Sequence, residues 1–344
     1  MFVNSLPLIR HSERVDYKRC PKKWFWRWRM GLVPKAKTFG ALELGTWFHS
    51  TLAAWYSQPD REGLSLTAWF KHFAELAIGG AKNIGAPDYT LEKADELAAL
   101  GEAMATAYQK KYGADPAIIP IVAEIPLEFD LTDADGKVFA KHKLKPDLVY
   151  REAANPDYVW LMEHKTAAQI RTEHLVIDDQ ARPYGAMAEI SLRRAGVLRK
   201  SDVFKGIMYN FVRKALTDER PVNEQGQSLN KNGSVSAKQP VPTLMRFPVT
   251  LTKASKRIAI SRLRIEAGII TGMTEALRSK KVDPALLPKT PHSSCPKLCP
   301  FFTMCVVEEQ GGDIKEMQRT MYERRDPYLY EEESTEVLTS FELS

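Results

Sequence analysis

Apolar side chains recur at every third or fourth position in the N-terminal third of the chain, which is the pattern of amphipathic helices. The stretches that show this pattern are residues 12–30, 41–57 and 66–112. In the first stretch, Cys20, Trp24 and Trp28 share one helical face, while Arg and Lys occupy the others. We therefore predict helices in all three stretches.

β-branched and aromatic residues dominate the middle of the chain, where the turn-forming sequences TDADGK and EAANPD separate three apolar segments. These segments are residues 118–131, 137–150 and 158–166. We predict that they form adjacent strands joined by hairpins. The same criteria then predict a helix, two strands and a last helix, at about 178–195, 204–215, 244–252 and 253–280.

This order of helices, strands, a helix and further strands predicts a mixed α/β domain. Between the last two strands, residues 217–243 are polar, contain Gly and Pro, and include almost no large apolar side chain. We expect this segment to be a long mobile loop. The chain has no internal repeat and no G-x-x-x-x-G-K-[ST] motif, so nothing indicates a nucleotide-driven motor.

The composition sets broad limits on size and location. With 344 residues, 44% of them apolar, the chain can bury a sizeable core in one large domain or two small ones. No apolar run approaches the roughly 18–20 residues of a membrane span, and the first residues lack the apolar stretch of a signal peptide. We therefore expect a cytoplasmic protein without a membrane partner.

The net charge is unevenly distributed along the chain. The formal value is +6, but residues 331–344 hold five Glu and no basic residue, so the other 330 residues carry +11. A basic body favours an anionic partner such as nucleic acid, although many basic proteins bind nothing anionic. We expect the acidic tail, residues 328–344, to be disordered.

Three of the four cysteines are clustered. Cys295, Cys299 and Cys305 have the spacing Cys-x3-Cys-x5-Cys, and Cys20 lies near the opposite end of the chain. In a reducing compartment such thiols are more typical of metal or cluster ligands than of disulfides. The alternative is that they are free thiols in the core.

The sequences KPDLVY and LMEHKTA place two carboxylates and a lysine close together. Because alternate residues of a strand share a face, Glu163 and Lys165 point the same way, and Asp147 at the end of the preceding strand can lie beside them. Two carboxylates next to a lysine form a site of the kind that holds Mg²⁺ or Mn²⁺ against a phosphate. Taken alone, a Glu-x-Lys pair is more often a solvated surface pair.

These residues resemble the signature of the PD-(D/E)XK nuclease superfamily. Its two pieces are Pro146-Asp147 and Glu163-His164-Lys165. The sequence QARPY, from Gln180 to Tyr184, resembles the Gln-x-x-x-Tyr motif of the RecB-like branch, and GTWFH resembles the Gly-x-x-x-His helix of that branch. The resemblance implies a restriction-endonuclease-like α/β core, with a central mixed β-sheet flanked by helices.

The resemblance also implies roles for these residues. His49, Asp147 and Glu163 would bind the metal, and Lys165 would activate water. Gln180 and Tyr184 would complete the catalytic set by positioning the nucleic acid or the catalytic groups.

A subset of RecB-like nucleases, including helicase-associated and CRISPR adaptation nucleases, holds a [4Fe-4S] cluster with one cysteine before the nuclease core and three after it. Here the resemblance implies that the cluster ligands are Cys20, Cys295, Cys299 and Cys305. Zn²⁺ held by the same thiolates is the rival occupant. The Cys-x3-Cys spacing is one residue longer than is common in the family, and the glycine that often precedes the metal-binding Asp is absent from KLKPD.

The resemblance covers residues 12–306 and implies a single nuclease domain, which we place at residues 1–327. Within it, segments 1–40 and 285–310 would be joined by the cluster. Loop 217–243 has no counterpart that we can assign.

The sequence KKWFWRWR near the N-terminus combines cations with aromatic rings. Such a combination suits single-stranded nucleic acid, whose bases stack on rings while basic groups follow the phosphates. The candidate contacts are Lys22, Lys23, Trp24, Arg27 and Arg29. The alternative is a helix whose aromatic residues pack around the cysteines while its basic face is merely solvated.

Our leading hypothesis from the sequence is a metal-dependent DNA exonuclease acting on single strands or free ends. Recombination, repair or phage DNA processing would suit such an enzyme, with a helicase or recombination protein as a possible partner. The first alternative is a catalytically inactive iron-sulfur or zinc subunit that binds nucleic acid. The second is a zinc-stapled DNA-binding protein without chemistry.

Overall fold

A five-stranded mixed sheet forms the centre of the computed structural model, which describes residues 6–36, 39–216, 218 and 220–329. Its strand order is β3 (Ile118–Ala123), β6 (Leu148–Glu152), β7 (Tyr158–Ala167), β8 (Val203–Arg213) and β9 (Leu244–Thr250). Only β7 and β8 run parallel within this sheet; the other neighbours are antiparallel. The predicted mixed α/β fold with a central sheet flanked by helices is thus confirmed.

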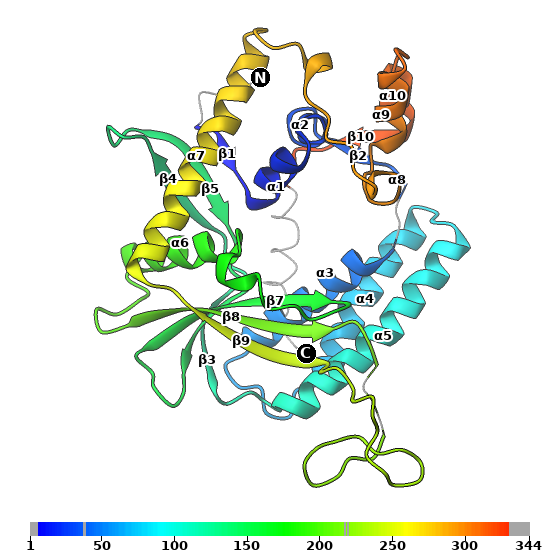
Figure 1. Ribbon diagram of the computed structural model, residues 1–344, viewed down its shortest axis with the longest axis vertical. Coiled ribbons are helices and arrows are strands. Elements are labelled where there is room, and N and C mark those ends of the chain that lie inside the picture. Colours follow the sequence, from blue (N-terminus) through cyan, green and yellow to red (C-terminus); the bar gives the residue numbers. More distant parts are fainter. Residues whose placement is uncertain (1–5, 37–38, 217, 219, 330–344) are drawn as a thin grey trace.

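Helices cover both faces of this sheet (Figure 1). One layer consists of α3 (Ala41–Tyr56), α4 (Leu66–Asn83) and α5 (Asp88–Tyr112), and the other of α6 (Ala181–Arg194) and α7 (Lys253–Arg278). Along β7, Trp160 and Met162 enter the core with α3–α5, while Val159 and Leu161 enter the core with α6 and α7. Burial on both faces explains why the first half of β7, residues 158–162, is continuously apolar.

A second, three-stranded sheet packs into the core beneath α6 and α7. Its order is β1 (Leu8–Ile9), β5 (Val138–Leu144) and β4 (Leu127–Thr132), with β1 parallel to β5. Segments 118–131 and 137–150 were each predicted as one strand, which is wrong, because each is divided between the two sheets. The divisions fall next to Pro126 and Pro146, where the missing N–H interrupts a ladder.

The predicted helix over residues 12–30 is also interrupted. It consists of α1 (His11–Arg19), α2 (Pro21–Trp24) and the π-helical turn η1 (Phe25–Arg29), and Cys20 between the first two has extended backbone angles. A residue before proline is pushed out of the helical region, so Pro21 ends α1 at Cys20. The stretch 66–112 is likewise two helices, with Gly85 at φ +71° and Pro87 between them.

The two ends of the described chain pack together (Figure 1). β2 (Leu32–Pro34) pairs antiparallel with β10 (Tyr322–Arg324), and an aromatic cluster that includes Trp26 and Phe301 lies beside them. The C-terminal side contributes short helices: η3 (Pro284–Leu286), α8 (Cys295–Leu298), α9 (Phe302–Glu309) and α10 (Lys315–Met321). Gly31 permits the close approach, because a Cβ atom there would lie 2.3 Å from the Arg325 carbonyl oxygen.

Three other sequence predictions concern regions outside these layers. Of the predicted loop 217–243, residues 220–243 form turns with two isolated bridges, Val222 to Ser228 and Leu229 to Val235, and the mobility of the loop stays a prediction. Most of the predicted acidic tail, residues 330–344, lies outside the described residues. Within the described part of the chain, no helix combines the length and apolar character needed to span a membrane.

Candidate active site

Three potential metal ligands meet at one end of the central sheet. His49 lies on α3, Glu124 directly follows β3, and Asp147 directly precedes β6. Each offers a ligand atom, and these atoms lie within 4.8 Å of one another. The closest ion-pair distance among them joins His49 Nδ1 to Asp147 Oδ1, at 3.5 Å. The described residues thus bring together a mixed oxygen and nitrogen donor set.

Backbone hydrogen bonds hold the two acidic residues in place. The backbone N–H of His164 on β7 donates to Asp147 Oδ2 at 2.7 Å. The backbone N–H of Glu124 donates to the carbonyl oxygens of Pro146 and Asp147 at 3.1 and 3.2 Å. The antiparallel pairing of β6 with both β3 and β7 therefore fixes the position of the Asp147 carboxylate.

Glu163 and Lys165 share the opposite face of β7 from His164, as the sequence predicted. The Lys165 ammonium lies 2.7 Å from Glu163 Oε1 and donates to Gln180 Oε1, at the start of α6, at 3.1 Å. Glu163 is not part of the group of three potential ligands, although Asp147 is close enough to affect its ionisation. The structure thus joins Gln180 to the acidic residues through Lys165.

Tyr184 faces the interior between α6, α1 and β5. It follows Gln180 by one turn of α6 and is buried, with its ring edge-on to those of His11 and His142 at centroid distances of 6.2 and 6.1 Å. This environment indicates a role in packing α1, α6 and β5 together behind the acidic residues.

Sequence analysis missed Glu124. It ends the apolar run IIPIVAE at a positive φ of 52°, and β3 pairs with the strand that follows Asp147. The available signal was an acidic residue at the end of a strand that neighbours the Pro-Asp segment. Strand order could not be deduced from the sequence, because 118–131 was taken as a single strand.

The protein environment disfavours the ionised forms of Glu124 and Glu163. Burial, reinforced by the Asp147 carboxylate, raises the pKa of Glu124 to about 7, although Lys145 opposes the shift. Burial also raises the pKa of Glu163 to about 7, against the attraction of Lys165. Buried carboxylates that repel one another favour a bound cation, because it offsets both effects.

Asp147 and His49 show the opposite behaviour. Burial would raise the pKa of Asp147, but the His49 imidazole and the His164 backbone N–H hold it well below its usual value. Burial would lower the pKa of His49, but Asp147 raises it. Together with the shifted Glu residues, these donors fit Mg²⁺ or Mn²⁺ chemically, since hard cations prefer carboxylate oxygens and Mn²⁺ also accepts imidazole.

Gly45 sets the distance between α3 and β7. A Cβ atom there would lie 2.9 Å from the Thr166 hydroxyl oxygen, closer than real Cβ contacts. Gly45→Ala should push α3 away and displace His49, which follows one turn later. We expect Mn²⁺ affinity, measured by electron paramagnetic resonance, to fall by about 10-fold. Adding Thr166→Ala removes the obstructing oxygen and should restore affinity; equal affinities in all three proteins would contradict this account.

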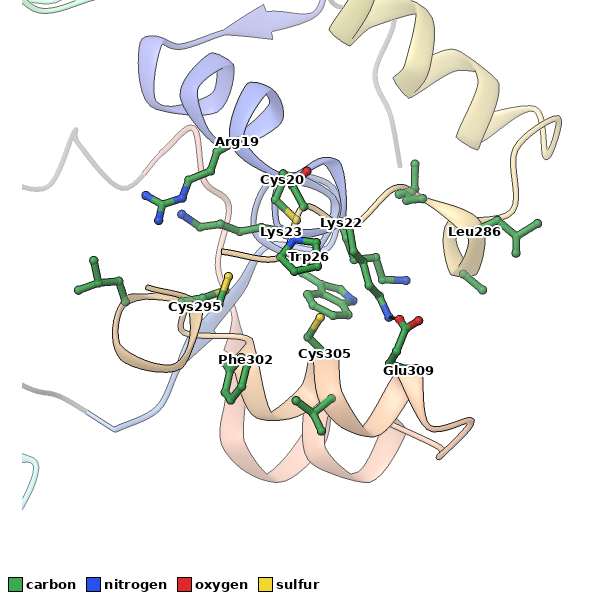
Figure 2. Close-up of a pocket in the computed structure, with 18 residues that line it drawn as sticks. Arg19, Cys20, Lys22, Lys23, Trp26, Leu286, Cys295, Phe302, Cys305 and Glu309 are labelled. Atoms are coloured by element: carbon green, nitrogen blue, oxygen red, sulfur yellow. Dashed lines mark hydrogen bonds and ion pairs between the residues drawn. The ribbon is translucent and has the colours of Figure 1, made fainter. Parts of the chain in front are cut away.

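The four cysteines line one cavity of about 620 Å³ between the two ends of the chain. Figure 2 shows Cys20 on the N-terminal side and Cys295 and Cys305 on the C-terminal side, with their sulfur atoms directed into the same space. Lys22, Lys23 and Lys289 also line the cavity and place positive charge around the thiols. All four predicted cluster ligands are thus brought together.

The thiols influence one another electrostatically. Burial raises the pKa values of Cys299 and Cys305, and the neighbouring Cys20 thiol adds to both shifts. In the described part of the chain, no three of the four sulfur atoms all lie within 4.8 Å of one another. A single zinc ion with Zn–S bonds of about 2.3 Å needs sulfur atoms about 3.8 Å apart. The four thiols are therefore not arranged here as the ligands of a single zinc ion.

Most of the N-terminal basic and aromatic side chains contact other residues of the protein and are not free to bind nucleic acid. Trp24 is completely buried and donates to Glu13, and Arg29 lies over its ring. Lys22 is buried too, pairing with Glu308. Trp24 therefore presents no exposed ring on which a base could stack, and Lys22 is paired inside the fold instead of solvated.

Lys23 and Arg27 share one ion-pair partner but differ from each other in accessibility. Both pair with Asp16, but 47% of the Arg27 side chain remains exposed. Of the five predicted nucleic-acid contacts, Arg27 is thus the side chain that a phosphate reaches most easily.

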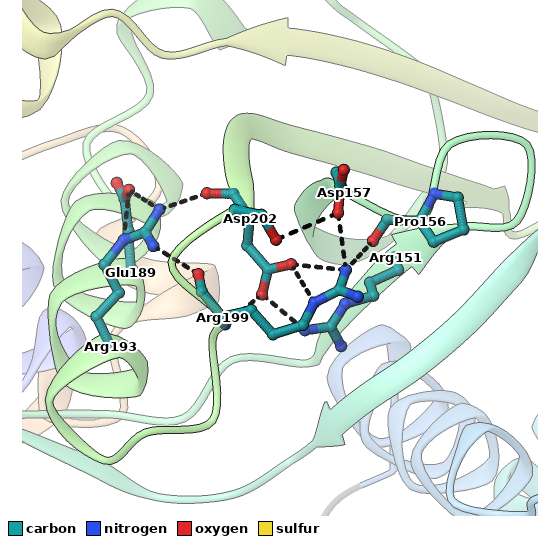
Figure 3. Close-up of polar contacts among 8 residues, drawn as sticks. Arg151, Pro156, Asp157, Glu189, Arg193, Arg199 and Asp202 are labelled. Atoms are coloured by element: carbon teal, nitrogen blue, oxygen red, sulfur yellow. Dashed lines mark hydrogen bonds and ion pairs between the residues drawn. The ribbon is translucent and has the colours of Figure 1, made fainter.

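A second charged cluster lies at the start of β8 and joins several elements (Figure 3). The Asp202 carboxylate accepts hydrogen bonds from Arg151 at 2.7 Å and from the Arg199 side chain at 2.9 Å. Arg193 on α6 donates to the Asp202 carbonyl oxygen at 2.7 Å. These contacts tie α6 to β6 and β8 and so fix the crossover between the parallel strands.

Comparison with known proteins gives one family. A model described as the PD-(D/E)XK nuclease superfamily matches residues 11–306, a range that includes the acidic site and all four cysteines. No curated protein matches the chain.

Proposed function

The chain belongs to the PD-(D/E)XK nuclease superfamily, and on this premise we propose that it is a metal-dependent deoxyribonuclease of the RecB-like branch, acting as an exonuclease on single strands or DNA ends. Nucleases of this superfamily use divalent metals. The observation that carries the proposal is the meeting of His49, Asp147 and Glu124 beside the Glu163–Lys165 pair. Recombination, repair or phage DNA processing, with a helicase as partner, would suit this activity.

In this proposal His49, Asp147 and Glu163 hold Mg²⁺ or Mn²⁺, and Glu124 is added as a fourth donor. A bound divalent cation supplies Lewis-acid polarisation of the scissile phosphoryl group and acidifies water. Because the fold holds these carboxylates in place, they need not move when charge develops during the reaction.

Lys165 acts as a positive charge. Burial would lower its pKa, but the Glu163 carboxylate outweighs this effect and raises it. The side chain therefore stays an ammonium, which cannot take a proton from water. Held between Glu163 and Gln180, it donates hydrogen bonds to the attacking water and offsets the negative charge that develops on the phosphate.

Metal binding should strengthen as the pH rises through 7. The raised pKa values of Glu124 and Glu163, both about 7, mean that each carries a proton in acid and must lose it to bind a cation. Below pH 7 we expect affinity for Mn²⁺ to increase up to about 10-fold per pH unit for each proton released. Calorimetry in buffers of different ionisation enthalpy measures this release, and Glu124→Gln should reduce it. A pH-independent affinity from 6 to 8 would refute the prediction.

We further propose that Cys20, Cys295, Cys299 and Cys305 hold a [4Fe-4S] cluster. The shared cavity and the surrounding lysines support it, since the cluster with four thiolates is anionic. Anaerobically purified protein should be brown with broad visible absorption. A colourless protein containing one equivalent of zinc would favour the rival occupant.

The nuclease proposal is tested with oligonucleotides, single-stranded and duplex, labelled at either end and incubated with Mn²⁺, Mg²⁺ or EDTA. We expect metal-dependent shortening, and the ladder from each label gives the polarity. Release of a label from a free end before internal cutting would identify an exonuclease. Binding of these DNAs without cutting under any metal would replace the proposal with a non-catalytic nucleic-acid-binding subunit.

A further inference from the structure

A chain of buried polar side chains lies behind β7, on the α3–α5 side of the sheet and opposite Glu163 and Lys165. It begins at His164 on β7 and passes through Asn210 on β8 and two tyrosines to an ion pair. Its almost completely buried members are His164, Asn210, Tyr108, Tyr56 and Asp115, and the last member is the partly buried Arg246. Its first member is the residue whose backbone N–H holds Asp147.

The ion pair at the far end fixes the direction of every hydrogen bond nearby. The Arg246 guanidinium can only donate, and it donates to Asp115 Oδ1 at 3.1 Å and to the hydroxyl oxygens of Tyr56 and Tyr108, both at 3.2 Å. The Asp115 carboxylate can only accept, and it lies 2.6 Å from the Tyr56 hydroxyl. Tyr56 therefore donates its proton to Asp115.

The donor and acceptor of each remaining hydrogen bond, from Tyr108 to His164, can then be assigned one after the other. The Tyr56 and Tyr108 hydroxyl oxygens lie 2.9 Å apart, and because Tyr56 has already donated its proton, Tyr108 must donate to it. The Tyr108 oxygen can then only accept from Asn210, at 3.0 Å, so the amide NH₂ group faces it. The same nitrogen lies 2.9 Å from His164 Nδ1. Nδ1 must therefore accept, which places the single ring proton on Nε2.

The ring of His164 lies next to the metal ligand His49. Their centroids are 5.8 Å apart with perpendicular planes, and Tyr56 stacks on His164 at 6.0 Å. Its Nε2 atom is buried and has no hydrogen-bond partner among the described residues. With Nδ1 occupied by Asn210 and Nε2 carrying a proton, His164 has no free lone pair with which to compete for a cation.

We propose that His164 is a positioning residue for the metal centre, locked as the neutral Nε2–H tautomer by Asn210 and by the hydrogen-bond chain from the Asp115–Arg246 pair. Its backbone fixes the Asp147 carboxylate, and its ring supports His49 without adding charge or a competing ligand. The inference rests on the proposed function in one respect, because this positioning matters only if His49 and Asp147 bind a cation.

The tautomer is read directly from long-range ¹H–¹⁵N correlation spectra of protein labelled with ¹⁵N-histidine, with His164→Gln used to assign the signals. In the wild type we expect a protonated Nε2 and an unprotonated Nδ1 at His164. Asn210→Leu keeps the size of the side chain but removes its donors. We expect it to give a mixture of tautomers and about 10- to 100-fold weaker Mn²⁺ binding by electron paramagnetic resonance.

Val212→Ala is the matched control, because Val212 is buried on the same strand and in the same core as Asn210. It should lower the melting temperature while leaving the tautomer and Mn²⁺ affinity unchanged. A proton on Nδ1 in the wild type would overturn the proposal even if Asn210→Leu does not fold. Equal Mn²⁺ affinity in wild type and Asn210→Leu would also overturn it. Neither readout involves DNA cleavage, so a failure here is distinct from a failure of the nuclease proposal.

Discussion

Replacing Lys165 with alanine is expected to lower kcat for DNA cleavage by about 10³-fold while the protein stays folded and binds Mn²⁺ with similar affinity. The variant removes the only group that Glu163 and Gln180 jointly hold in the described structure. A fixed charge at the reacting phosphate contributes on the order of 10²–10³-fold to the rate, or about 3–4 kcal/mol. Single-turnover cleavage of an end-labelled strand under saturating Mn²⁺ measures the effect.

The control for this experiment is Lys141→Ala. Lys141 is a partly exposed lysine on β5 that pairs with Glu128, and its loss removes the same charge far from the acidic residues of the candidate active site. We expect cleavage to be almost unchanged in the control. If Lys165→Ala retains more than a tenth of wild-type kcat, the catalytic role that we assign to this lysine is wrong.

Cys20→Ser should have the largest effect on stability. Cys20 is the one cysteine contributed by the N-terminal segment, and the other three lie on the C-terminal side of the cavity. Losing it should abolish the brown colour and release the N-terminal segment. Because metal binding at structural sites can contribute on the order of 10 kcal/mol to folding, we expect the melting temperature to fall by about 10 °C or more.

Leu298→Ala serves as the control for the cysteine variant. Leu298 lines the same cavity and is exposed, so its truncation leaves all four thiols in place. It should keep both the colour and most of the stability. A Cys20→Ser protein that remains brown and melts with the wild type would show that Cys20 is not a ligand.

Patterns within single strands and helices predicted the positions of most residues of the acidic site. Alternation along one strand was enough to place Glu163 and Lys165 together, and apolar periodicity over residues 41–57 correctly predicted the helix that carries Gly45 and His49. The position of Glu124 depends on the pairing of β3 with β6, which is a long-range contact that no local pattern encodes.

The errors have physical causes of the same kind. The spacing of Cys20 and Trp24 predicted a single helix, but Pro21 restricts the residue before it more strongly than apolar periodicity favours a helix. The exposed role suggested for Trp24 failed because Glu13 and Arg29, 11 residues before and five after it in sequence numbering, surround the ring. An isolated motif cannot show which of its rings the rest of the fold will bury.

The pairing of β2 with β10 has a consequence for how the protein is made. Pro34 leaves the ribosome about 290 residues before its partner Tyr322, which at roughly 5–20 residues per second is a delay of about 15–60 s. During that interval Trp26 and Leu32 lack the aromatic partners that later cover them. The nascent N-terminal segment therefore leaves these apolar side chains uncovered, and prone to aggregation, for most of translation.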